Sequence, residues 1–218
     1  MRNISIAPNE YYHLFNRGVL KQDIFLNDRD RVRFLFALLH FQSNFTLTNP
    51  EYYVNNYIEH RVFNISKKTA DKILEDRSVE LTSFCLMPNH FHLLVLEKNE
   101  GGIAKYMQRI LNAYTKYFNT KYKKSGHLFQ GPYKAVHVES NSQLLHLSAY
   151  IHRNPRELAG WKNKEENYQW SSYQDYTKDN RWGDLLAKEI IEGQFDDKND
   201  YKEFLETSPA KIGLDELG

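Results

Sequence analysis

Residues 79–96 read VELTSFCLMPNHFHLLVL and determine how the rest of the chain is interpreted. Two runs rich in apolar, β-branched and aromatic residues, 79–87 and 90–96, flank the dipeptide Pro88-Asn89. Runs of this length and composition are typical of strands, and proline and asparagine favour tight turns. We therefore predict an antiparallel hairpin in the middle of the chain.

Hydrophobic periodicity on both sides of this hairpin predicts a β–α–β–β–α–β order followed by one further helix. This order is that of the ferredoxin-like split β–α–β fold, an α+β architecture with helices packed on an antiparallel sheet. The elements expected are strands at 10–17 and 133–139, a helix capped by Asp28 that runs to Leu39, a helix at 103–122, and a third helix capped by Asn141 or Ser142.

The chain divides into a core and two additions. We expect the core to cover residues 10–160, with a polar insertion at about 44–76 that contains a helix near 67–74. Residues 161–218 form a C-terminal helical extension that becomes acidic, with ten Asp/Glu against four Lys from Gly183 onward. A charged segment of this kind is interpreted as a solvated appendage.

Composition excludes several classes of protein. Hydrophobic residues make up 41% of the 218 residues, enough for a folded globular chain. Cys85 is the only cysteine, which excludes a disulfide framework and a multi-cysteine zinc site, and its apolar neighbours predict a core position. No apolar run is long enough to cross a membrane and no signal peptide is recognisable, so we expect a soluble, cytoplasmic protein with no membrane partner.

The formal net charge of +1 conceals a strong segregation of charge along the chain. Residues 105–138 contain seven Lys/Arg and no Asp or Glu, interleaved with aromatic side chains. A basic block with aromatic residues is suited to holding phosphates and stacking unpaired bases. The sequence therefore indicates a nucleic acid as the partner of this block.

Two short patterns contain residues capable of chemistry. In a strand, His90 and His92 point to the same face and can form half of a metal site, although such a pair alone is more often only packed. Tyr150 and Asn154 lie one helical turn apart, and the Asn154 amide oxygen suits Mg²⁺ or Mn²⁺. Pro155 is expected to end or bend the helix at Asn154.

Several motifs, taken together and in order, resemble the HUH single-tyrosine transposases, most closely their REP-associated branch. The resemblance covers residues 10–176 and is more specific than the histidine pair alone. The motifs are YYHLFNRG (11–18), KQDIF (21–25), MPNHFHLLV (87–95), SGHLFQGPYKA (125–135), AYIHRNP (149–155) and WSSYQDY (170–176).

The resemblance implies a metal-dependent enzyme that recognises a DNA hairpin and cuts and rejoins single-stranded DNA. It implies that Tyr150 is the nucleophile that forms a 5′-phosphotyrosine, and that His90, His92 and Asn154 hold Mg²⁺ or Mn²⁺. It also implies the ferredoxin-like core, and it leaves a homodimer possible. His127, His137 and His152 are not assigned to the site.

The residues expected to contact DNA are all basic. They are Arg17, Lys116, Lys121, Lys123, Lys124 and Lys134.

Two other functions stay open from the residues alone: a module that binds hairpin DNA or RNA without cutting it, and a metal-dependent phosphohydrolase in which water attacks. The acidic extension also has a second interpretation, in which it competes with DNA for the basic surface.

Overall fold

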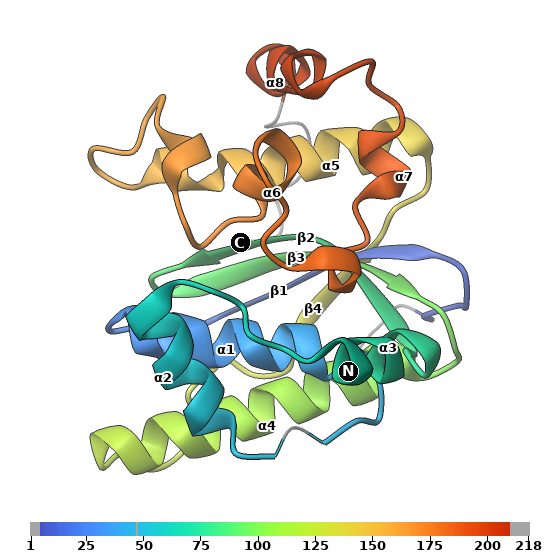
Figure 1. The fold of residues 1–218 in the computed structure, drawn as a ribbon. Helices are drawn as coiled ribbons and strands as arrows, with labels where there is room; N and C mark the ends of the chain where they lie inside the picture. The colour runs from blue at the N-terminus through green and yellow to red at the C-terminus, as the bar shows by residue number, and fades with distance from the viewer. Residues whose placement is uncertain (1–4, 47, 210–218) are drawn as a thin grey trace.

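The computed structural model describes residues 5–46 and 48–209 and has an α+β architecture in three layers (Figure 1). A four-stranded antiparallel sheet lies in the middle, with strand order β2-β3-β1-β4. This order confirms the predicted ferredoxin-like core, because each crossover helix joins two parallel strands that are separated by a third. The strands are β1 (Tyr11–Arg17), β2 (Val79–Met87), β3 (His90–Glu97) and β4 (Lys134–His137).

The hairpin predicted at 79–96 forms as β2 and β3, with Met87 paired to His90 across the Pro88-Asn89 turn. Nearly every residue of both strands is buried, because helices cover both faces of the sheet (Figure 1). Cys85 is fully buried, as its sequence context predicts. The buried β2–β3 hairpin therefore holds the residues at its turn in place.

Helices α1 (Asp28–His40) and α4 (Gly102–Tyr122) pack on one face of the sheet. Tyr114 and Phe118 of α4 are core residues, as predicted, and the Tyr114 hydroxyl donates to the Ile24 carbonyl oxygen at 2.5 Å. The N-cap of α1 is Asn27, whose side chain accepts from Asp30 N, so the prediction of Asp28 was wrong by one residue. Asparagine and aspartate can both act as N-caps, but Asn27 has the extended backbone that an N-cap adopts.

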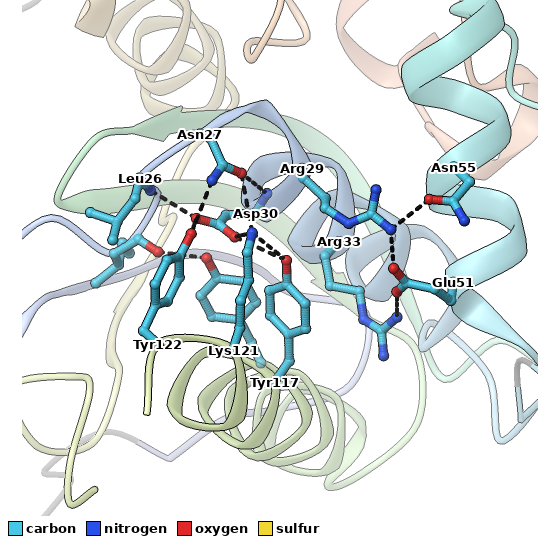
Figure 2. A network of polar contacts seen from close by, with 12 residues as sticks. Leu26, Asn27, Arg29, Asp30, Arg33, Glu51, Asn55, Tyr117, Lys121 and Tyr122 are labelled. Carbon is cyan, nitrogen blue, oxygen red and sulfur yellow. Dashed lines mark hydrogen bonds and ion pairs between the residues drawn. The ribbon is translucent and has the colours of Figure 1, made fainter. Parts of the chain in front are cut away.

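A buried carboxylate joins the start of α1 to the end of α4 (Figure 2). Asp30 is fully buried and accepts from Leu26 N at 2.9 Å, Tyr117 Oη at 2.9 Å and Tyr122 Oη at 2.7 Å. The Lys121 ammonium lies 2.6 Å from the same carboxylate. A buried charge must be paired and hydrogen-bonded, and here both conditions are met.

The insertion between α1 and β2 contains two helices. They are α2 (Pro50–His60), which was not predicted, and α3 (Lys67–Glu75), which matches the predicted helix near 67–74. Tyr57 of α2 stacks on Trp182 with 5.7 Å between ring centroids. An aromatic contact therefore ties the insertion to the C-terminal part of the chain.

Helix α5 (Asn141–Arg153) covers the other face of the sheet and begins at the N-cap Ser140, not at Asn141 or Ser142 as predicted. Ser140 Oγ accepts from Gln143 N at 3.2 Å. Short turns and helices follow α5 and pack around it: Asn154–Glu157, Glu165–Asn167, α6 (Tyr173–Thr177), Gly183–Leu185, α7 (Glu189–Glu192) and α8 (Lys198–Thr207).

The acidic extension is not a solvated appendage in its described part, which corrects the prediction. Tyr201 and Leu205 of α8 are buried, and the Tyr201 hydroxyl lies 2.7 Å from His152 Nδ1 on α5. Glu206 accepts twice from Arg156, at 2.7 and 2.8 Å. Figure 1 places α8 on the opposite side of the sheet from the basic helix α4. Residues 210–218 of the acidic region lie outside the described residues.

The extension also protects one edge of the sheet. Leu86 N donates to the Trp170 carbonyl oxygen at 2.9 Å, and Ser172 N donates to the Phe84 carbonyl oxygen at 3.0 Å. These bonds satisfy backbone groups on the outer side of β2 that an edge strand otherwise leaves open. No helix in the described part of the chain is both long and apolar enough to span a membrane.

Candidate functional site

The start of β3 places two histidines on the face of the sheet covered by α5. Phe91 points the other way, toward α1, where its ring centroid lies 5.1 Å from that of Phe34. His90 and His92 alternate with Phe91 and so point toward α5, with their ring centroids 5.0 Å apart. The alternation expected from the sequence is therefore present.

The end of α5 supplies the two other predicted residues. Tyr150 lies in its last turn, and Asn154 follows directly after Arg153. Asn154 keeps right-handed helical angles, φ −51° and ψ −36°, although Pro155 follows it. The helix ends where expected, but the chain continues as a tight 3₁₀ turn and does not bend away, which keeps Asn154 on the side of Tyr150.

All four predicted residues converge at one place between β3 and α5. Asn154 Oδ1 lies 3.2 Å from His90 Nε2, although 64 residues separate them in the chain. The Tyr150 ring lies edge-on to the His92 ring, with 5.3 Å between centroids. Asn154 is 3% exposed and His92 is 7% exposed, while Tyr150 is partly exposed.

The hydrogen bonds of Asn89 fix the protonation of His90. Asn89 Nδ2 donates to the Lys21 carbonyl oxygen at 3.1 Å, so Asn89 Oδ1 faces His90 Nδ1 at 2.7 Å. Asn89 Oδ1 therefore accepts a hydrogen bond from His90 Nδ1, which carries the proton of the ring. Burial lowers the pKa of His90 to about 4, and a neutral ring protonated at Nδ1 has its lone pair at Nε2. That lone pair faces Asn154 Oδ1, which is also an acceptor, while Asn154 Nδ2 is buried without a partner.

Two facing acceptors are unfavourable unless the Asn154 amide is rotated or a cation binds both atoms. These ligand atoms suit such a cation, because Mn²⁺ binds both imidazole nitrogen and amide oxygen, and Mg²⁺ binds the oxygen. Among the described residues, no cluster of three or more His, Cys, Asp or Glu side chains is placed to hold a metal ion. A metal site here therefore depends on the amide of Asn154 as its third protein ligand.

His13 of β1 is a site residue that the sequence interpretation missed. Its Nε2 lies 2.9 Å from His92 Nδ1, and its ring is edge-on to Tyr150 at 6.0 Å. Burial lowers the pKa of His13 to about 3 and that of His92 well below its usual value, so both rings are neutral. A hydrogen bond between His13 Nε2 and His92 Nδ1 fixes the orientation of the His92 ring. When His92 Nδ1 carries the proton and donates it to this bond, the lone pair of His92 Nε2 can bind a metal.

Two of the predicted DNA contacts share the face of the sheet that carries the histidines. Arg17 pairs with His90 in the β1–β3 register, and Lys134 of β4 pairs with Phe15, which in turn pairs with His92. Residues paired across antiparallel strands point to the same side. Arg17 and Lys134 therefore flank the site.

The other predicted contacts lie on α4 or at its end, beyond the opposite face of the sheet (Figure 1). Lys116, Lys123 and Lys124 are exposed. Lys121 differs, because its ammonium is held by the buried Asp30 (Figure 2). This ion pair gives Lys121 a structural role that its place in a basic block did not indicate.

The loop after α4 connects these lysines to the site. Gln130 N donates to the Arg17 carbonyl oxygen at 2.8 Å, and Asn16 Nδ2 donates to the Gly131 carbonyl oxygen at 3.2 Å.

His152 is not part of the site, since its two ring nitrogens bond to Tyr201 Oη and Ser172 Oγ at 2.7 Å each.

The family model described as "Transposase IS200 like" matches residues 41–154. This range includes all four residues that converge between β3 and α5. A search among curated proteins finds no relative of the chain.

A solved structure, "Structure of the REP associates tyrosine transposase bound to a REP hairpin", is similar in fold, with a TM-score of 0.55 and 11% sequence identity. The alignment covers 83% of this chain and 87% of that one. At this identity the likeness concerns the fold, and the DNA hairpin belongs to that other protein.

Proposed function

The chain belongs to the IS200-like transposase family, and from this premise we propose that it cuts and rejoins single-stranded DNA at a hairpin. In this proposal Tyr150 is the nucleophile, and His90, His92 and Asn154 hold a divalent metal, Mg²⁺ or Mn²⁺. The catalytic unit comprises residues 10–160, with residues 161–218 as an extension whose described part, residues 161–209, packs against it.

The observation that carries the proposal is the contact between His90 Nε2 and Asn154 Oδ1 at 3.2 Å. This contact joins the start of β3 to the end of α5, and both of its atoms have lone pairs that can bind a cation. Tyr150 lies one turn before Asn154 on the same side of α5. A cation at these atoms would thus lie beside the tyrosine.

The proposed reaction balances without a nucleotide cofactor. Tyr150 Oη forms a bond to phosphorus and gives up its proton, the P–O3′ bond breaks, and the 3′ oxygen takes up a proton. The products are a 5′-phosphotyrosine and a free 3′-hydroxyl, and the reverse reaction rejoins a strand. A metal held by His90, His92 and Asn154 would polarise the phosphate and stabilise the charge on its oxygens.

Single-stranded flanks of the hairpin would reach the site across the face that carries Arg17 and Lys134. From there the exposed Lys123 and Lys124 extend the positive surface along the loop 125–131, with Lys116 farther along α4. Lys121 contributes less, because its charge is already paired with Asp30. Phosphate contacts of this kind position a strand without reading its sequence.

Covalent capture tests the proposal. Wild type, Tyr150→Phe and Tyr52→Phe are incubated with labelled hairpin oligonucleotides drawn from the DNA flanking the gene, with Mg²⁺, Mn²⁺ or EDTA, and are resolved on denaturing gels. Tyr52 is a suitable control because it is 54% exposed and lies on α2, away from the site. We expect a metal-dependent adduct that Tyr150→Phe abolishes and Tyr52→Phe retains.

Other outcomes favour the other functions. An adduct that survives in Tyr150→Phe excludes Tyr150 as the nucleophile. Cleavage without any adduct indicates a hydrolase in which water attacks, and binding without cleavage indicates a hairpin-binding module.

A further inference from the structure

The turn between β1 and α1 exposes a leucine in a strained backbone conformation. Leu20 is 94% exposed, with φ 53°, and Lys21 directly after it has φ 61°. The left-handed region costs an L-residue about 1–2 kcal/mol unless it is glycine or, to a lesser extent, asparagine or aspartate. Single exposed leucines are ordinary, but one held in this conformation is not.

The turn is rigid, because its backbone is anchored at several points. Gly18 N donates to the Asn89 carbonyl oxygen at 2.8 Å, and Val19 N donates to the Leu128 carbonyl oxygen at 3.0 Å. Within the turn, Lys21 N donates to the Gly18 carbonyl oxygen at 3.0 Å. A Cβ at Gly18 would lie 2.2 Å from the Gln22 carbonyl oxygen, so only glycine permits this close return of the chain.

The same turn is connected to the proposed metal site. Asn89 bonds to the Lys21 carbonyl oxygen with Nδ2 and to His90 Nδ1 with Oδ1. Arg17, just before the turn, pairs with His90 across the strands. Leu20 therefore projects into solvent from a rigid turn that borders the proposed metal site.

From this we infer that Leu20 packs against an unpaired nucleobase of the bound DNA strand, next to the phosphate that is cut. Leucine is one of the apolar side chains that proteins insert against base steps. The partly exposed Arg17 and the exposed Lys21 on either side of it are suited to the adjoining phosphates, so the surroundings match a nucleic acid better than an apolar protein partner. The inference rests on the proposed function, since it requires DNA at the site.

The test compares three substitutions in the Tyr150→Phe background, where the DNA stays uncut. Leu20→Asn removes the apolar contact and places in the turn a residue that tolerates the left-handed conformation. Leu20→Met keeps an apolar side chain. Val62→Asn makes the same kind of change at a valine that is 59% exposed on the insertion.

Binding is measured with fluorescently labelled hairpin oligonucleotides that carry 2-aminopurine at each unpaired position in turn. We expect Leu20→Asn to raise the Kd about 5- to 100-fold, as for the loss of one buried leucine side chain. It should also change 2-aminopurine fluorescence at one position, while its Tm equals or exceeds that of the parent. Leu20→Met and Val62→Asn should bind within about twofold of the parent.

A Kd for Leu20→Asn within about twofold of the parent overturns the inference and leaves the proposed function intact. A drop in Tm that parallels the weaker binding also overturns it, because the effect is then on folding. If the parent binds no hairpin at all, the proposed function fails, and this inference fails with it.

Discussion

Replacing Asp30 by alanine is expected to destabilise the protein strongly, because it removes the acceptor that joins the start of α1 to the end of α4. The change leaves the Lys121 ammonium, two tyrosine hydroxyls and the backbone N–H of Leu26 without the carboxylate they all contact. Breaking a buried ion pair from one side costs about 3–5 kcal/mol. The Lys121 side chain is 27% exposed and can partly reach water, so we expect the lower half of this range, about 3–4 kcal/mol.

Figure 2 also contains a matched control. Glu51 pairs with Arg29 and Arg33, but its side chain is 50% exposed. Exposed ion pairs contribute about 0–1 kcal/mol, so Glu51→Ala should change stability little. The two variants each remove one carboxylate that pairs with cations, and they differ in burial.

The assay is thermal unfolding by scanning calorimetry. For a chain of this size about 1 kcal/mol corresponds to about 2–4 °C, so Asp30→Ala should lower the Tm by about 6–16 °C and Glu51→Ala by less than about 4 °C. Adding Lys121→Met to Asp30→Ala should recover about 1 kcal/mol, because no unpaired charge remains. Equal Tm values for Asp30→Ala and Glu51→Ala would refute the reasoning that burial makes this carboxylate important.

Three further predictions concern the metal site, the extension and alkaline pH. His13→Leu should weaken Mn²⁺ binding about tenfold or more in calorimetric titration, because it removes the partner of His92 Nδ1; unchanged affinity would contradict that role. Tyr201→Phe leaves His152 Nδ1 without its hydrogen bond and should lower the free energy of unfolding by about 1–3 kcal/mol, measured by urea unfolding. An unchanged free energy of unfolding would contradict a stabilising role for the contact between α8 and α5. Burial raises the pKa of Tyr117 to about 12, so the contribution of Tyr117 to stability should be constant below pH ~10 and be lost between pH ~10 and about 12, because the unfolded chain loses the phenol proton first; the loss of stability over this range should be shallower in Tyr117→Phe.

The fold was predictable wherever the spacing of apolar residues along a strand or helix matched the side chains that the element buries. The 79–96 hairpin, the helix around Tyr114 and the order of strands and helices along the chain all follow from alternation and 3.6-residue spacing, because both faces of the sheet are covered and constrain the sequence. The helix starts were displaced by a residue or more, to Asn27 and Ser140, since several adjacent side chains can cap and backbone angles decide.

Long-range pairing was not predictable from local pattern. Lys121 belongs to a run of lysines, and only the fold shows that Asp30, 91 residues away, neutralises it. His13 and His92 are separated by 79 residues, and their contact depends on strand register. The signal that was available is that His13 and Arg17 occupy alternate positions of one strand and so share a face.

The pairing of β1 has a consequence for how the protein is made. Tyr12 is synthesised well before its strand neighbours Val95 and His137. At 5–20 residues per second, roughly 4–16 s pass between synthesis of β1 and completion of its partner strand β3. During that interval the aromatic segment Tyr11–Arg17 has no sheet to join, so it is exposed to aggregation in the nascent chain.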